Sequence, residues 1–235
     1  ECGLKDILDT FIEKGDPNQK VMYNEDDISY IHKLVRQRKP FTTLEFAVGF
    51  STLTIAHALM LNKKEFESLK EKPKVRNTKM FKHYVVDSNE FWLNNTKSKF
   101  PADLLLFVEF NYSETYITML GNLQICSLYK QIPDVVAEFI YLDAPDPNDV
   151  AGSINGLTFQ CPERTVISGD LLLMESTFLP GTFILVDGRT NNVRFLKKNF
   201  QRNYEFFWDK VFDRSTFELK EEKLGPHNLL GSEIY

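Results

Sequence analysis

The stretch TTLEFAVGFSTL at residues 42–53 decides the fold class of this chain. Its first part, Thr42 to Val48, is β-prone and mostly apolar, as is typical of a buried parallel strand. Gly49 interrupts that run, and Leu53 to Leu61 then has the composition of a helix. The order of strand, glycine turn and helix opens a βαβ unit. The stretch therefore predicts an α/β fold with a largely parallel sheet.

Acids follow four of the predicted strands, at or near the end of each one: Glu45, Asp87, Asp143 and Asp187. In an open parallel sheet these ends lie along one edge, where the ligand crevice forms. A carboxylate beside a partly buried cleft needs a partner, such as a ribose hydroxyl, an ammonium group or a metal. Each acid could instead cap the helix that follows it. Because the pattern returns four times, we favour the cleft.

The remaining chain fits one domain at residues 40–235, preceded by a helical extension at residues 1–39. Asp26 or Asp27 can cap the second helix of that extension. Gly121-Asn122 predicts a turn that pairs two strands, and residues 144–168 form a long connection that could act as a lid. The expected helices are 4–11, 26–38, 53–61, 89–97, 169–178 and 191–199, and the expected strands are 42–48, 83–87, 104–110, 116–120, 123–128, 138–143, 182–186, 204–208 and 215–221.

Three segments resemble motifs of the class I S-adenosylmethionine-dependent methyltransferases. EFAVGFST at residues 45–52 resembles the first motif, in which an acid ends the strand and glycines let the backbone approach the cofactor. FIYLDAP at 139–145 resembles the strand-four motif, and LPGTFILVD at 179–187 resembles the strand-five segment. The closing pair of strands matches the antiparallel hairpin of that fold. The resemblance covers about residues 42–221, with Ala47 in place of the usual first glycine.

This resemblance implies a Rossmann-like methyltransferase fold: a mostly parallel seven-stranded sheet with an antiparallel terminal hairpin and helices on both faces. It also implies S-adenosylmethionine as the cofactor. We expect Glu45, Gly49 and Asp87 to converge on one pocket shaped for the adenosyl group. The cofactor-binding positions that the resemblance implies are Glu45, Ala47, Gly49, Ser51, Thr52, Asp87, Ser88, Ser127, Leu128 and Asp143.

Asp143 and Asp187 are the candidate catalytic residues. In catechol-like O-methyltransferases, acids at matching strand ends hold a divalent metal that lowers the pKa of the acceptor hydroxyl. The resemblance therefore allows a metal such as Mg²⁺ at these two acids. Gly188 stands where that family has an amide ligand, and Asn191 or Asn192 could replace it.

Two further positions have alternative interpretations. Arg189 could bind an anionic substrate through its planar guanidinium, or it could form an ion pair with a nearby acid. Phe91 and Trp92 could stack near adenine, although ordinary packing is the simpler interpretation.

The composition of the 235 residues limits the partners that we expect. A formal net charge of -5 argues against a broad nucleic-acid surface. The three cysteines, Cys2, Cys126 and Cys161, form no CxxC pattern, which argues against a zinc site or a disulfide framework and fits a reducing compartment such as the cytoplasm. No apolar run approaches the ~18 residues of a membrane span. We expect a small-molecule acceptor, and a homo-oligomer stays open.

The sequence thus predicts an S-adenosylmethionine-dependent methyltransferase that O-methylates a small polar metabolite or a sugar. One alternative is a non-catalytic cofactor-binding or scaffold protein with the same fold, which Ala47 and Gly188 motivate. Another is a nucleotide-sugar or dinucleotide enzyme on a true Rossmann domain. The absence of GxGxxG from the sequence and the terminal hairpin count against that alternative.

Overall fold

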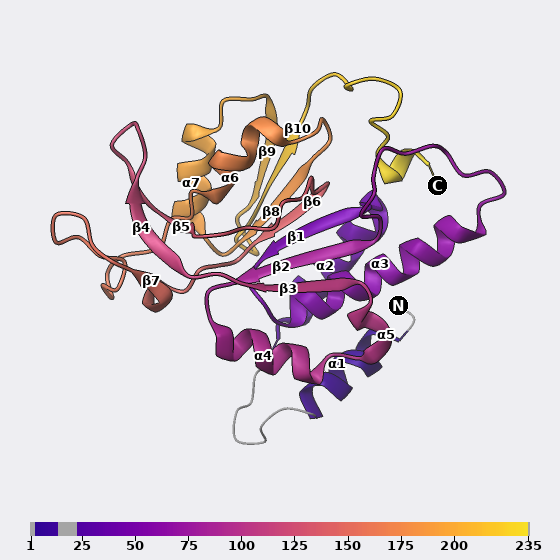
Figure 1. Ribbon diagram of the computed structural model, residues 1–235, viewed down its shortest axis with the longest axis horizontal. Helices are drawn as coiled ribbons and strands as arrows, with labels where there is room; N and C mark the ends of the chain where they lie inside the picture. Colours follow the sequence, from indigo (N-terminus) through magenta and orange to yellow (C-terminus); the bar gives the residue numbers. More distant parts are fainter. Residues whose placement is uncertain (1–2, 14–22, 235) are drawn as a thin grey trace.

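The central feature of the computed structural model is a seven-stranded sheet; the structure describes residues 3–13 and 23–234 (Figure 1). The strand order is β3-β2-β1-β6-β8-β10-β9. β3, β2, β1, β6 and β8 pair in parallel, whereas β10 is antiparallel to both β8 and β9. The predicted mostly parallel sheet with an antiparallel terminal hairpin is confirmed. The strands are β1 (Thr42–Phe46), β2 (Lys82–Asp87), β3 (Val108–Tyr112), β6 (Phe139–Leu142), β8 (Phe183–Asp187), β9 (Tyr204–Asp209) and β10 (Arg214–Leu219).

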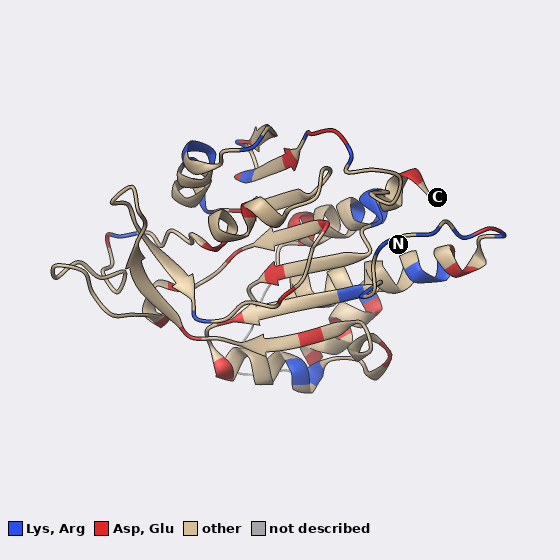
Figure 2. Ribbon diagram, turned by 45° about the horizontal axis from the view of Figure 1, so that its top comes forward, with Lys and Arg blue, Asp and Glu red and all other residues tan. Residues whose placement is uncertain are grey.

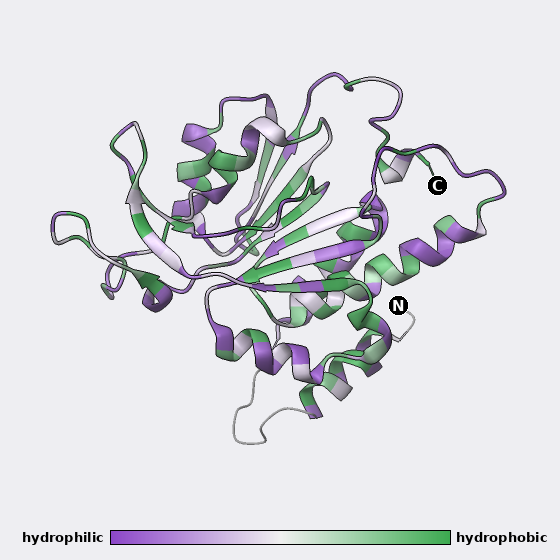
Figure 3. Cartoon of the chain, viewed as in Figure 1, coloured by the Kyte–Doolittle hydropathy of each residue, from purple (hydrophilic) through white to green (hydrophobic). Residues whose placement is uncertain are grey.

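Helices cover both faces of this sheet, as expected (Figure 1). On one face, α1 (Leu4–Glu13), α2 (Glu25–Arg38), α3 (Phe50–Ser68) and α5 (Ala102–Leu105) share a hydrophobic core with the sheet. On the other face, α6 (Asp170–Met174) and α7 (Thr190–Asn199) pack on a second core. α4 (Glu90–Lys99) lies beside β3. Figure 3 shows the apolar residues concentrated along the central strands, which is the pattern of strands buried on both faces.

The start of α2 differs from the sequence prediction. The side chain of Asn24, not Asp26 or Asp27, caps the helix by accepting a hydrogen bond from the Asp26 amide at 3.0 Å. Asp27 instead accepts a hydrogen bond from Nε of Arg214 in β10 at 2.8 Å. The Arg214 side chain is 6 % exposed, so this ion pair is largely buried and joins α2 to β10.

A small second sheet lies at the end of the molecule where the parallel strands terminate (Figure 1). It comprises β4 (Thr115–Met119), β5 (Ile125–Tyr129) and β7 (Val150–Ala151) in the order β5-β4-β7. The predicted pairing around Gly121-Asn122 is confirmed, because β4 and β5 are antiparallel. This hairpin lies in the connection between β3 and β6, and its Cys126, Leu128 and Tyr129 enter the second core. A β-hairpin thus covers part of that face of the sheet.

The predicted strand over 104–110 was wrong in its first half. Ala102–Leu105 forms the short helix α5 after Pro101, and β3 begins only at Val108. A short apolar run fits a buried helical turn as well as a strand, and here Leu104 packs fully buried in the first core. The long connection after β6 also contains more structure than expected: the 3-10 helix η1 (Pro147–Asp149) and β7.

The two cysteines that the structure describes, Cys126 and Cys161, are free, and Cys2 lies outside the described residues. Within residues 3–13 and 23–234, no helix is both long and apolar enough to cross a bilayer.

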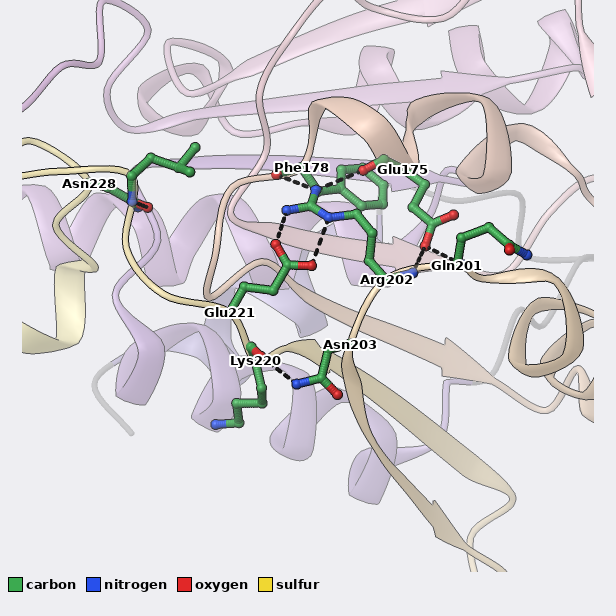
Figure 4. Close-up of polar contacts among 9 residues, drawn as sticks. Glu175, Phe178, Gln201, Arg202, Asn203, Lys220, Glu221 and Asn228 are labelled. Carbon is green, nitrogen blue, oxygen red and sulfur yellow. Dashed lines mark hydrogen bonds and ion pairs between the residues drawn. The ribbon is translucent and has the colours of Figure 1, made fainter.

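Arg202 joins three elements at the base of the second core (Figure 4). Its Nη1 donates to the carbonyl oxygens of Glu175 at 3.0 Å and Phe178 at 2.7 Å. Its Nε donates to Glu221 at 3.0 Å, and Nη2 also contacts that carboxylate. The buried Glu175 carboxylate in turn accepts the backbone amides of Gln201 and Arg202 at 2.8 and 2.9 Å. The network therefore connects η2 (Glu175–Thr177) to both ends of the terminal hairpin.

We predict that Arg202→Ala lowers the free energy of unfolding by about 2 kcal/mol, because two carbonyls and a carboxylate lose their donor. Urea unfolding followed by circular dichroism measures this change. Lys220→Ala is the matched control on the same hairpin: its side chain is 48 % exposed and makes ion pairs with Glu205 and Glu218, so we expect a loss within about 0.5 kcal/mol. Equal losses in the two variants would contradict the role given to Arg202.

Candidate functional site

A cleft of about 560 Å³ opens at the carboxyl ends of the parallel strands. It lies where β1, β2 and β6 end, which is the edge that the series of strand-end acids predicted. Figure 2 shows acidic residues at the ends of central strands and in the loops that follow them. The cleft is lined by Ala47, Val48, Asp87, Asn89, Trp92, Asp143, Ala144, Asp146, Pro147, Asn148, Asp149 and Arg189.

Asp87 is the acid at the end of β2, and its carboxylate borders the cleft. One carboxylate oxygen accepts the Asn89 amide at 2.7 Å. Desolvation raises the pKa of Asp87 to about 6, and the nearby charges of Asp149 and Glu45 act in the same direction. Ser88 follows it, with its hydroxyl 3.5 Å from a carboxylate oxygen of Asp149. Asp87 retains capacity to accept further hydrogen bonds from a ligand hydroxyl.

Glu45 lies inside the protein and is not part of the cleft lining. Its carboxylate is fully buried and is 2.8 Å from Nε2 of His83 on the neighbouring strand. The Ser51 hydroxyl donates to the other carboxylate oxygen, and Nδ1 of His83 is 2.8 Å from the Thr43 hydroxyl. This chain of hydrogen bonds attaches the first turn of α3 to β1 and β2.

The turn between β1 and α3 consists of Ala47, Val48 and Gly49. Ala47 has a φ of 148°, a conformation that a residue with a Cβ seldom adopts, and this is where the related motif has a glycine. Gly49 precedes α3, and its amide donates to the Thr52 hydroxyl at 3.0 Å. Ala47 and Val48 line the cleft, but Gly49 does not. We expected Glu45, Gly49 and Asp87 to converge on one pocket. Of the three, only Asp87 lines this cleft.

Asp143 and Arg189 form a pair on the opposite side of the cleft. Nε of Arg189 is 3.5 Å from Oδ1 of Asp143, and Nη2 donates to the carbonyl oxygens of Asp143 at 2.8 Å and Pro145 at 3.0 Å. Of the two interpretations of Arg189, the ion pair is present in the structure. Desolvation raises the pKa of Asp143 to about 6, against the opposing charge of Arg189. The Asp143 side chain is still 50 % exposed, so it can reach a ligand.

Asp187 does not line the cleft, although it follows the next strand. Its Oδ2 accepts a hydrogen bond from the Tyr141 hydroxyl at 3.0 Å. Desolvation and the nearby negative charge of Asp27 in α2 raise the pKa of Asp187. The two amides expected as replacement ligands are also engaged elsewhere. Asn192 holds both backbone groups of Ser168, at 2.8 and 3.0 Å, and Asn191 donates to Thr165 at 2.7 Å.

These contacts do not provide a divalent-metal site. A hard cation in a protein takes several oxygen ligands around one point. Asp143 is paired with Arg189, and Asp187 is held by Tyr141. Across the part of the chain that the structure describes, no three His, Cys, Asp or Glu side chains are grouped so that they could hold a metal ion. The residues present therefore do not fit the metal that the resemblance allows.

Ser127 and Leu128 lie in a strand, as the predicted strand 123–128 requires, but away from the cleft. Both lie inside β5 of the small sheet, where they are buried, and the Ser127 hydroxyl donates to the Ile167 carbonyl at 3.2 Å. Neither lines the cleft. They belong to the hairpin of β4 and β5, which is part of the three-stranded sheet and not of the seven-stranded sheet. Their role in cofactor binding stays a prediction.

Of the two aromatic residues considered for stacking, Trp92 is 40 % exposed and borders the cleft, next to Phe91 at a ring-centroid distance of 5.4 Å. Sequence reasoning left out Asn89 and the turn from Asp146 to Asp149, which also line the cleft. The available signal was the Asp-, Asn- and Pro-rich composition directly after Asp143, which indicates a functional loop but not which of its residues face a ligand.

The fold of this chain is similar to that of several solved methyltransferases. The methyltransferase PaMTH1 of Podospora anserina, bound to S-adenosylhomocysteine, has a TM-score of 0.57 at 12% identity and covers 94% of this chain and 89% of its own. A methyltransferase from Geobacter sulfurreducens has a TM-score of 0.51 at 8% identity and covers 92% and 89%. The O-methyltransferase from Bacillus cereus, in complex with S-adenosylhomocysteine, has a TM-score of 0.50 at 13% identity and covers 94% and 91%.

No protein-family model matches the sequence, and no curated protein matches it. At these identities the likeness concerns the fold. The strand order, the terminal hairpin and the structural likeness agree with one another, and the chain has the fold of the class I S-adenosylmethionine-dependent methyltransferases.

Proposed function

We propose that this protein is an S-adenosylmethionine-dependent methyltransferase that transfers a methyl group to an oxygen atom of a small polar acceptor. The observation that carries the proposal is the open cleft at the ends of β1, β2 and β6, with Asp87 on its wall. Two of the compared structures, from Podospora anserina and Bacillus cereus, hold S-adenosylhomocysteine. A ligand at this edge is what the sheet topology favours.

The cleft residues suit the parts of that cofactor. The Asp87 carboxylate can accept both ribose hydroxyls, and Trp92 offers an exposed ring for the adenine. Four aspartates line the cleft against the single cation Arg189, so the charge favours a sulfonium and an ammonium group: Asp87, Asp143, Asp146 and Asp149. Glu45, Ser51 and Thr52 support the turn beneath the cofactor through their hydrogen bonds.

The bound cofactor would supply a methyl group already activated by its positively charged sulfur. The protein then has to position an acceptor oxygen and to remove a proton from it. Asp143 is placed for the second task, because its side chain is half exposed in the cleft and its pKa of about 6 leaves it ionised at neutral pH. Asp187 lies outside the cleft lining, and its catalytic role stays a prediction.

A cofactor-binding protein without catalysis is the second candidate. The observation that favours it is that Ala47 and Gly188 depart from the motifs that the chain otherwise resembles. The sugar acceptor, the cytoplasmic location and a homo-oligomer stay predictions from the sequence.

The first prediction of this proposal is that the protein binds the cofactor product. Titration calorimetry should detect S-adenosylhomocysteine binding with a submillimolar dissociation constant, and no heat with NAD. Absence of binding at millimolar cofactor would contradict the proposal. Binding without methyl transfer from labelled S-adenosylmethionine to any of a broad set of hydroxyl acceptors would favour the second candidate.

The second prediction concerns Asp87 and pH. Its raised pKa means that the cofactor-free protein binds a proton there below about pH 6, and the protonated form is the poorer acceptor for ribose hydroxyls. Affinity for S-adenosylhomocysteine should therefore fall as the pH drops through 6, by up to about tenfold per unit. Asp87→Asn should weaken binding about tenfold at pH 8 and flatten the pH dependence.

The control for this measurement is Asp146→Asn, a change of equal charge in the same cleft. It should preserve the pH dependence of the wild type. The folding stability should depend on the same carboxyl group: its raised pKa contributes stability that is complete below the unfolded value of 3.8 and is lost as the pH rises through about 6. Asp87→Asn should remove that loss. An unchanged pH profile of binding in Asp87→Asn would contradict the assignment.

The third prediction concerns Ala47. Ala47→Gly should raise the free energy of unfolding by about 1 kcal/mol, because a glycine adopts the positive φ without strain and this gain exceeds its entropy cost. Affinity for S-adenosylhomocysteine should be equal or higher. Ala58→Gly, inside α3, is the matched control and should lower stability by about 1 kcal/mol or more. A loss of stability in Ala47→Gly similar to that of the control would show that Ala47 is not strained.

A further inference from the structure

We propose that the guanidinium of Arg189 takes the place of a divalent cation in this site, so that the protein positions its acceptor oxygen with a built-in cation and without a metal. This inference rests on the proposed function for its meaning, but its test does not require that the cofactor binds. It concerns one side chain and the loop that follows β6.

The surroundings of Arg189 are those that a hard cation would take. Its nitrogens face three oxygen atoms of one short loop: the Asp143 carbonyl at 2.8 Å, the Pro145 carbonyl at 3.0 Å and the Asp143 carboxylate at 3.5 Å. Carboxylate and backbone carbonyl oxygens are the ligands that Mg²⁺ and Ca²⁺ prefer. A guanidinium binds the same oxygens as a donor, and it carries its positive charge permanently.

The backbone holds Arg189 at this position. Gly188 before it has a φ of 61°, a left-handed conformation that glycine adopts readily, and Arg189 itself is the N-cap residue of α7. The side chain is 19 % exposed, so most of it is fixed by protein contacts. The sequence therefore has Gly188 at the position where the resemblance implies an amide ligand, and a cation one residue later.

The other groups that would complete a metal site have partners of their own. Asp187 accepts the Tyr141 hydroxyl, and Asn191 and Asn192 bind the connection before α6. Their engagement is independent of Arg189, so two observations agree. The first is that the Arg189 guanidinium already binds the oxygen atoms of the loop after β6. The second is that the side chains which could have completed a metal site bind elsewhere in the protein.

The arrangement leaves one part of the guanidinium for the acceptor. Among the residues that the structure describes, no group accepts from Nη1, and Arg189 lines the cleft. Nη1 can therefore donate to the acceptor oxygen while Asp143 takes its proton. With S-adenosylmethionine bound, the S–CH₃ bond would break as the O–CH₃ bond forms and the sulfur would keep the bonding electron pair, so that S-adenosylhomocysteine, the methylated acceptor and protonated Asp143 would result.

Manganese titration of the metal-free, EDTA-treated protein tests the proposal, with the electron paramagnetic resonance signal of free Mn²⁺ as the readout. The wild type should leave that signal unchanged up to millimolar Mn²⁺. Arg189→Asn removes the guanidinium, provides an amide oxygen and frees Asp143, so we expect it to gain binding of one Mn²⁺. The double variant Arg189→Asn/Asp143→Asn should lose the binding that the single variant gains.

Two results would overturn the proposal. One is micromolar Mn²⁺ binding by the wild type that Asp143→Asn abolishes, since the metal would then share the site with Arg189. The other is the absence of Mn²⁺ binding by a folded Arg189→Asn protein, since the oxygen set would then not be a cation position. Arg189→Gln serves as a second variant if the first fails to fold, and circular dichroism checks both.

Calorimetry with S-adenosylhomocysteine on the same samples separates the two proposals. If the wild type binds neither Mn²⁺ nor cofactor, the proposed function fails while the assignment of Arg189 stands. If it binds cofactor and also binds Mn²⁺ through Asp143, the function stands and the assignment of Arg189 fails.

Discussion

The buried hydrogen bonds of Glu45 are the constraint on which the geometry of the site depends. A carboxylate without solvent access is unfavourable unless its oxygens have partners, and here both have one, His83 on β2 and Ser51 on α3. Because the two partners come from different elements, the bonds determine how β1, β2 and the start of α3 lie relative to one another. The wall of the cleft formed by Ala47 and Val48 is a consequence of that arrangement.

The hairpin β4–β5 supplies a second constraint on the cleft. It covers part of one face of the sheet, and its residues Cys126 and Leu128 pack in the same core as Leu44 and Phe46 of β1. A strand pair has no free helix end to offer to a ligand, so the cleft is lined by the segments that follow β1, β2, β6 and β8. The loop after β6 then becomes the main source of polar groups, from Asp143 to Asp149.

Much of the fold could be predicted from the sequence, because local patterns specify it. The apolar strands, the turn Gly121-Asn122 and the terminal hairpin are visible in short windows, and the structure confirms them. The failures occurred where a short window has two solutions. Residues 104–110 read as a strand because a few apolar residues cannot distinguish a strand from a buried helical turn.

The candidate site was harder to predict, because it depends on which way each acid points. Glu45 is the fourth residue of β1 and faces inward, whereas Asp87 ends β2 at the cleft. Glu45 is in register with Val85, so Asp87 shares its face of the sheet but lies two residues further along, at the carboxyl end of the strand where the cleft opens. The partners His83 and Tyr141 lie 38 and 46 residues away from the acids they bind, and no local pattern announces such pairs.

The four acids at the strand ends therefore differ in what they can still do, although the sequence presents them as a series. Glu45 has both oxygens engaged inside the protein, and Asp187 is held by Tyr141 away from the cleft lining. Asp143 faces the cleft, but its carboxylate already forms an ion pair with Arg189. Only at Asp87 do the hydrogen bonds to the protein come from the backbone, while no cation acts on its carboxylate within the described residues. A carboxylate in that condition gains most from hydroxyl donors, and this is why we propose Asp87, among the four acids, as the position that binds a ribose.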